Sequence, residues 1–166
     1  MNTLKEHWIG MFGLIALCAG IPLEAGAMQN ACNIAGVFGL IAYAKVKNNA
    51  FFFYLELVVM LSTLLKIFAV SPIILITALI IATSLALLKI FQDPAYRVWD
   101  TAFGLIGLSG LVYGYAALSN YGYAVGGVAS AIYSIIGFRK GLKSGFIFAI
   151  LNLIYGGIAI FMIVKG

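Results

Sequence analysis

Charged residues are scarce in this sequence. Aspartate, glutamate, lysine and arginine make up only 9% of its 166 residues, whereas 64% are hydrophobic and the mean hydropathy is +1.11. A typical soluble domain is about 25% charged. So few charges cannot cover a water-soluble globule, and most of the surface must therefore face lipid. The composition predicts an all-α integral membrane protein with the lipid bilayer as its surroundings.

Familiar enzyme motifs are also missing. The sequence has no nucleotide-binding loop, no GxSxG and no HExxH. Its single histidine, His7, has no companion at metal-ligand spacing, and Cys18 and Cys32 do not form a CxxC pair. We therefore expect no enzymatic activity, no metal and no cofactor, and no direct drive by ATP.

The net charge of +5 does not indicate nucleic-acid binding, because the basic residues stand singly between apolar runs. They act instead as topology signals. If the N-terminus is cytoplasmic and the C-terminus outside, only Lys66 and Lys165 lie outside, and the positive-inside rule favours that orientation. We expect a bacterial inner (plasma) membrane. The eight basic residues then on the cytoplasmic side are Lys5, Lys45, Lys47, Lys89, Arg97, Arg139, Lys140 and Lys143.

The apolar residues fall into seven runs of about the length that crosses a bilayer. Ser71 and Pro72 begin the fourth run, since proline suits a first helical turn. Residues 8–45 allow two interpretations, either two short helices joined by a tight turn or one span with a re-entrant piece. The predicted spans are 8–23, 29–45, 50–69, 72–91, 98–117, 121–138 and 145–164.

The first and fifth runs resemble each other. Trp8 pairs with Trp99, an offset of 91 (99 − 8), and the same offset aligns FGLI at 12–15 with FGLI at 103–106. The match predicts a duplication. Two parallel three-helix repeats, 1–70 and 94–166, would be joined by a linker transmembrane helix, 71–93. Folds of this plan bind substrate between the repeats near the midplane and rock one repeat against the other.

In the segment 120–156, Asn120 is followed by an aromatic-Gly-aromatic unit, then by a small-residue run with Ser130 and Tyr133, a basic loop with Lys143, and a final run that contains Tyr155 and Gly156. With this pattern the segment resembles the PnuC family of bacterial nicotinamide riboside transporters, which is related to the SWEET sugar transporters. The resemblance implies the three-one-three arrangement, facilitated diffusion of a vitamin or nucleoside, and a possible homotrimer. A SWEET-like sugar carrier and a non-transporting membrane scaffold or partner subunit remain alternatives. The matching positions are Asn120, Tyr121, Gly122, Tyr123, Ser130, Tyr133, Lys143, Tyr155 and Gly156.

Polar side chains inside the spans are the candidate substrate-binding residues, since burying them in hydrocarbon is costly. Glu56 and Asn152 occupy nearly matching repeat positions, and we expect them to face each other across the cleft. Glu56 would accept a hydroxyl or take up a proton, and Asn152 would bind a ribose or an amide. The alternative for both is polar contact between helices. Asn33 lies one turn inside its span and is a further candidate.

Aromatic and small residues complete the candidate site. Tyr113, Tyr133 and Tyr155 lie deep in their spans and offer rings for stacking on a planar ligand, although packing is the commoner role. Ser130 belongs both to the resemblance and to a small-residue spacing that predicts close helix packing. A carrier should line its cleft with these polar and aromatic groups, whereas a scaffold should have an apolar seam.

Other polar residues receive structural interpretations. Asn30 and Asn120 are predicted to cap helices at the membrane boundary. Lys66 sits near the end of its span, where its stem can snorkel toward water. Asp93, Arg97 and Asp100 are predicted to form a solvated loop cluster.

Overall fold

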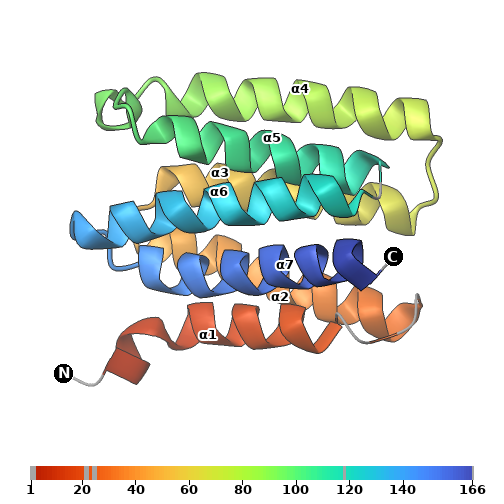
Figure 1. Cartoon of the computed structure of the whole chain (residues 1–166), viewed down its shortest axis with the longest axis horizontal. Helices are drawn as coiled ribbons and strands as arrows, with labels where there is room; N and C mark the ends of the chain where they lie inside the picture. Colours follow the sequence, from red (N-terminus) through yellow and green to blue (C-terminus); the bar gives the residue numbers. More distant parts are fainter. Residues whose placement is uncertain (1–2, 21–22, 24–25, 118, 166) are drawn as a thin grey trace.

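The structure is a computed structural model that describes residues 3–20, 23, 26–117 and 119–165. These residues form seven α-helices and one short 3-10 helix, which lie side by side along one direction with their connections alternating between two ends (Figure 1). The elements are α1 (Thr3–Gly20), α2 (Ala27–Val46), α3 (Ala50–Ile67), α4 (Pro72–Ile90), η1 (Pro94–Tyr96), α5 (Thr101–Ala117), α6 (Asn120–Arg139) and α7 (Gly145–Lys165).

Four of these helices, α3, α4, α6 and α7, are long and apolar enough to cross a membrane. Shorter apolar stretches occur in α1, over His7–Gly20, and in α5, over Thr101–Gly114. The all-helical prediction is therefore confirmed. Residues 8–45 form two separate helices, α1 and α2, rather than one span with a re-entrant piece.

Local sequence explains where several helices begin. The Asn49 side chain accepts a hydrogen bond from the Phe52 amide at 3.2 Å and caps α3. Ser71 caps α4 at 3.5 Å, with Pro72 in the first helical turn as expected. Ser119, not Asn120, caps α6, so the capping role predicted for Asn120 is wrong. Gly26 precedes α2 without a side-chain cap, so Asn30 does not cap that helix.

Within each group of three helices, the order of packing follows the order in the chain. Helix α2 lies between α1 and α3, and α6 lies between α5 and α7. The two groups meet where α3 contacts α5 and where α1 contacts α7. These six helices therefore form a closed ring, and α4 packs outside it against α3 and α5 (Figure 1).

Glycines allow the closest helix contacts in the ring. A Cβ atom added to Gly127 of α6 would lie 2.6 Å from the backbone nitrogen of Gly156 in α7. One added to Gly36 of α2 would lie 2.8 Å from the backbone nitrogen of Leu17 in α1. Small residues at such positions let helix backbones approach and gain dispersion contacts where no water is available to drive association.

One prediction about the connections is wrong. Asp100 is buried rather than solvated, because Lys140 at the end of α6 donates to its Oδ2 at 2.7 Å. Asp93 does remain exposed, where it accepts a hydrogen bond from the Ala95 amide and starts η1. The buried Asp100 ties the start of α5 to the end of α6.

Candidate functional site

A cavity of about 580 Å³ lies at the end of the bundle where α2 and α6 begin and where α1, α3 and α7 end. We call it the outer cavity. Its volume is in the range of small-molecule sites. Apolar surface forms the larger part of its lining. Amide, hydroxyl and ammonium groups form the rest, on Gln29, Asn30, Asn33, Asn120, Thr63, Tyr123, Tyr155 and Lys66.

A second, much smaller cavity lies deeper in the ring, and we call it the inner cavity. It measures about 20 Å³, room for a single water molecule. Glu56 of α3 and Asn152 of α7 both line it, as does Tyr155, which also lines the outer cavity. Tyr155 therefore borders both spaces.

Glu56 and Asn152 differ in how their polar groups are satisfied. The Asn152 Nδ2 donates to the Phe148 carbonyl of its own helix at 2.8 Å, which leaves the amide oxygen for another partner. Glu56 is only 3% exposed, and its carboxyl has no hydrogen-bond or ion-pair partner among the described residues. A carboxyl buried in this way is the costliest polar group of the site.

Aromatic rings close the ring of helices one turn beyond the inner cavity, on the side away from the outer cavity. Phe52 precedes Glu56 by four residues, and Phe148 precedes Asn152 by four, about 6 Å along each helix. The two phenyl rings stack with centroids 3.9 Å apart and planes within 4°. Phe51 packs beside them at 4.5 Å from the Tyr133 ring.

Polar contacts tie the same end of the bundle together. The Asn49 Nδ2 donates to the Ser144 Oγ at 2.9 Å and so joins the start of α3 to the start of α7. The Ala50 amide donates to the Tyr96 hydroxyl at 3.1 Å, and burial raises the pKa of that hydroxyl. The His7 ring hydrogen-bonds the Tyr43 hydroxyl. Cross-contacts thus concentrate at the end opposite the outer cavity.

The structure brings together only part of the predicted site. Asn33 and Tyr155 line the outer cavity, and Glu56 and Asn152 share the inner one. Tyr133 lies in the aromatic cluster instead.

Two predicted ligands lie elsewhere. Tyr113 is 58% exposed and lines neither cavity, because its position on α5 turns it away from the ring. Ser130 is fully buried against α5, where a Cβ atom on Gly107 would meet its Oγ at 2.2 Å. Neither residue is therefore placed to contact a solute in either cavity.

Sequence reasoning missed several residues of the outer cavity or gave them other roles. The sequence predicts Asn30 and Asn120 as caps and Lys66 as a snorkelling side chain, and it marks Tyr123 only as a position of the family resemblance. All four line this space. Thr63 also lines it, although nothing in the sequence marks this residue as a candidate. Their common signal is position, since each lies within about two turns of the same end of the bundle.

Comparison with known proteins adds no assignment: no family model, no curated protein and no solved structure matches this chain.

Proposed function

We propose that this protein is a membrane carrier that moves a small polar solute by alternating access. The observation that carries the proposal is the outer cavity, which reaches Tyr155. Beyond Tyr155 lies the inner cavity with Glu56 and Asn152, and the stacked Phe52 and Phe148 rings lie between that cavity and the opposite end of the bundle. A cavity open at one end and closed by movable side chains at the other is the form of a carrier that faces one side of the membrane.

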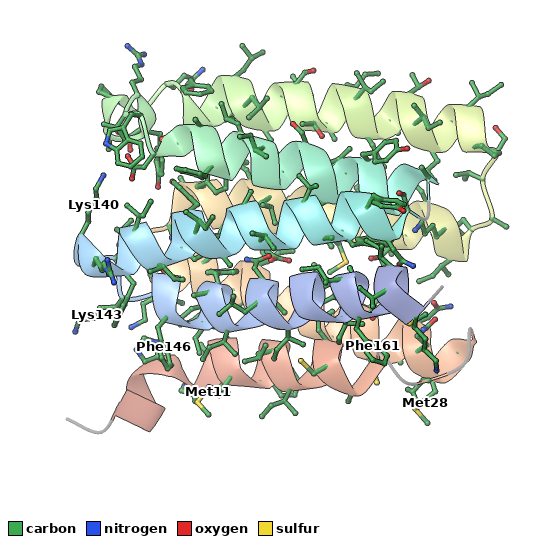
Figure 2. The ribbon with its side chains drawn as sticks, in the orientation of Figure 1. Met11, Met28, Lys140, Lys143, Phe146 and Phe161 are labelled. Atoms are coloured by element: carbon green, nitrogen blue, oxygen red, sulfur yellow. The ribbon has the colours of Figure 1, made fainter. Side chains whose placement is uncertain are left out.

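The membrane setting of the proposal rests on length and charge. Four helices are long and apolar enough to span a bilayer. Lys140 and Lys143 lie at the end where α1 begins, while Met28 lies toward the other end (Figure 2). With the basic end in the cytoplasm, the outer cavity opens to the outside of a bacterial inner membrane, and the N-terminus is cytoplasmic.

The proposed mechanism uses the two groups of three helices as repeats. The same packing order, with the second helix in the middle, holds for α1–α3 and for α5–α7. In a parallel repeat, rocking one group against the other opens the shared cleft to each side in turn. Without a nucleotide-hydrolysing motif in the sequence, the simplest form of this transport is facilitated diffusion.

The lining favours a solute with planar amide or hydroxyl groups. Side-chain amides present a donor and an acceptor together, and tyrosine rings offer flat surfaces. Nicotinamide riboside, the solute of the family that the C-terminal half resembles, combines a planar amide with a ribose. A sugar would find similar partners, so a sugar carrier is the second candidate. The polar groups in the lining of the outer cavity argue against a pure scaffold, whose seam would be apolar.

Uptake by liposomes containing the purified protein tests the proposal. Radiolabelled nicotinamide riboside and glucose are the probes, and we expect uptake of one of them above that of empty liposomes. Tyr155→Phe should slow uptake, because it removes a hydroxyl between the cavities. Tyr113→Phe removes a hydroxyl from an exposed tyrosine and should leave uptake unchanged. If the protein carries neither these probes nor any of a panel of vitamins, nucleosides and sugars, the carrier function is rejected.

A further inference from the structure

Two carboxyl groups are buried in the described part of the chain, and their surroundings differ. Asp100 is neutralised by Lys140, whose Nζ lies 2.7 Å from Oδ2. The Glu56 carboxyl makes no hydrogen bond or ion pair with the described residues, although Asn152 and Tyr155 line the same inner cavity. An unpaired carboxylate is strongly disfavoured in apolar surroundings, so this closed arrangement suits a neutral Glu56 better than a charged one.

Among the described residues, no neighbour of Glu56 has a positive charge that could neutralise its carboxylate in place of a proton. The walls of the inner cavity come from α1, α3, α5 and α7, and their residues besides Glu56 are Leu17, Leu55, Val59, Leu111, Leu151, Asn152 and Tyr155. Tyr155 is the titratable one among them. The other helices packed on α3 carry their lysines in their last turns, Lys45 in α2 and Lys89 in α4, at the opposite end. Lys66 lies ten residues along α3, about 15 Å away.

Glu56 is nevertheless close to a route from outside. Tyr155 lines both the outer cavity of about 580 Å³ and the inner cavity of about 20 Å³. Because Tyr155 borders both spaces, an opening movement of the helices that displaces it would bring water and a solute to the carboxyl. A proton can then leave to water, and the carboxylate that remains needs a new partner before the helices close again.

We propose that Glu56 is an exchange site, at which a proton and the positively charged group of a solute replace one another. The proposal rests on the carrier function above and replaces its simplest form, facilitated diffusion, with coupled exchange. The seam between the two helix groups closes only over a neutral site, which is either protonated Glu56 or the Glu56 carboxylate paired with the cation. Solute and proton therefore move in opposite directions, and the gradient of one drives the other.

Labelling with dicyclohexylcarbodiimide tests this directly, since the reagent adds to protonated carboxyls in apolar surroundings. The full-length protein in lipid is treated and the adduct is located by mass spectrometry. We expect an adduct on Glu56 that forms more slowly as the pH rises. Glu56→Gln should carry none, whereas Asp100→Asn should keep the adduct on Glu56.

A matched pair of probes tests the exchange. Nicotinamide riboside has a positively charged pyridinium ring, and its reduced dihydro form has the same ribose and amide without the charge. At about ten times its dissociation constant, the cationic probe should slow labelling roughly tenfold by occupying the site, and the neutral form should not slow it. In weakly buffered solution, binding of the cationic probe should release protons from wild type and none from Glu56→Gln.

The outcomes separate this proposal from the carrier function. An unlabelled Glu56, or labelling that the cationic probe does not slow, overturns the exchange site. If liposomes still take up nicotinamide riboside in that case, the carrier function stands alone. If they take up no solute either, both proposals fail.

Discussion

Single glycines decide how closely α6 and α7 approach, and one of them gives a sharp test. On Gly127 a Cβ atom would lie 2.6 Å from the nitrogen and 2.7 Å from the Cα of Gly156, backbone atoms that cannot rotate away. We expect Gly127→Ala to lower the free energy of unfolding by roughly 1–3 kcal/mol, the usual cost of overpacking. The measurement is thermal unfolding of the purified protein in detergent.

Gly157 provides the matched control in the same helix pair. Nothing lies within 4 Å of a Cβ atom there. Gly157→Ala should therefore be neutral or stabilising by up to about 1 kcal/mol, the helix-propensity gain of alanine over glycine. Equal melting temperatures for the two alanine variants would contradict the close packing of α6 on α7.

Asn49 holds two helix starts together. It is 3% exposed, caps α3 and donates to the Ser144 Oγ at 2.9 Å. Asn49→Ala should cost roughly 1–3 kcal/mol of stability, because it leaves buried polar groups unsatisfied. Ser71→Ala removes an exposed cap with a 3.5 Å hydrogen bond and should cost at most about 0.5 kcal/mol.

A double-mutant cycle isolates the link between the two helices. The loss from Asn49→Ala and the loss from Ser144→Ala should not add, because both variants remove the same hydrogen bond. Denaturant unfolding of the four proteins gives the coupling. Additive losses would show that Asn49 acts only as a cap.

Part of the site could be predicted from sequence, residue by residue. Glu56 and Asn152 were predicted to meet, and both line the inner cavity, since buried polar residues in an apolar chain are few and their repeat positions match. Tyr113, in contrast, was predicted in the site but lies on the exposed face of α5. A helix in lipid is apolar on every side, so its sequence does not indicate which face turns toward its neighbours.

For whole helices, the sequence predicted where each one lies along the chain better than it predicted which helices pack together. Each predicted span overlaps a helix because bilayer thickness limits length and breaks need polar residues, Gly or Pro. The helix α1 begins at Thr3, before the apolar run, because Lys and Glu are good helix formers though they are not apolar. The ring order, with α4 outside, depends on contacts distant in sequence and could not be read from the runs.

In the proposed carrier the starts of α3 and α7 form the closed end, and a substitution of one phenylalanine tests this. The Phe52 and Phe148 rings stack at 3.9 Å across the ring of helices. Phe52→Ala should speed release of nicotinamide riboside from preloaded liposomes, because it opens the closed end. A Phe→Ala change in a core costs about 3–5 kcal/mol, so Phe52→Leu serves as a variant that keeps most of the volume.

Phe161 is the control, since it lies on α7 but is 61% exposed (Figure 2). Phe161→Ala should release the solute at the wild-type rate. If folded Phe52→Ala or Phe52→Leu also releases it at that rate, the aromatic stack is packing and not a seal.

For the whole molecule, the distribution of charge implies an orientation. The connections at the end where α1 begins carry most of the basic residues, and the opposite end carries Lys66 and Lys165. Positive residues are retained on the cytoplasmic side during insertion. The ends of the bundle are thus distinguishable by labelling, and the outer cavity should open on the face opposite to the basic end.

Single cysteines test this topology once Cys18 and Cys32 are replaced by alanine. Ser71, Gln92 and Leu142 are exposed in connections, Ser71 at one end of α4 and the other two at the opposite end of the bundle. In intact cells an impermeant maleimide should label Ser71→Cys alone. It should label Gln92→Cys and Leu142→Cys only after the membrane is opened. The mirror pattern would reverse the orientation and make the outer cavity face the cytoplasm. Labelling of all three in intact cells would mean that α4 does not cross the membrane, and without that crossing the two helix groups cannot be parallel repeats.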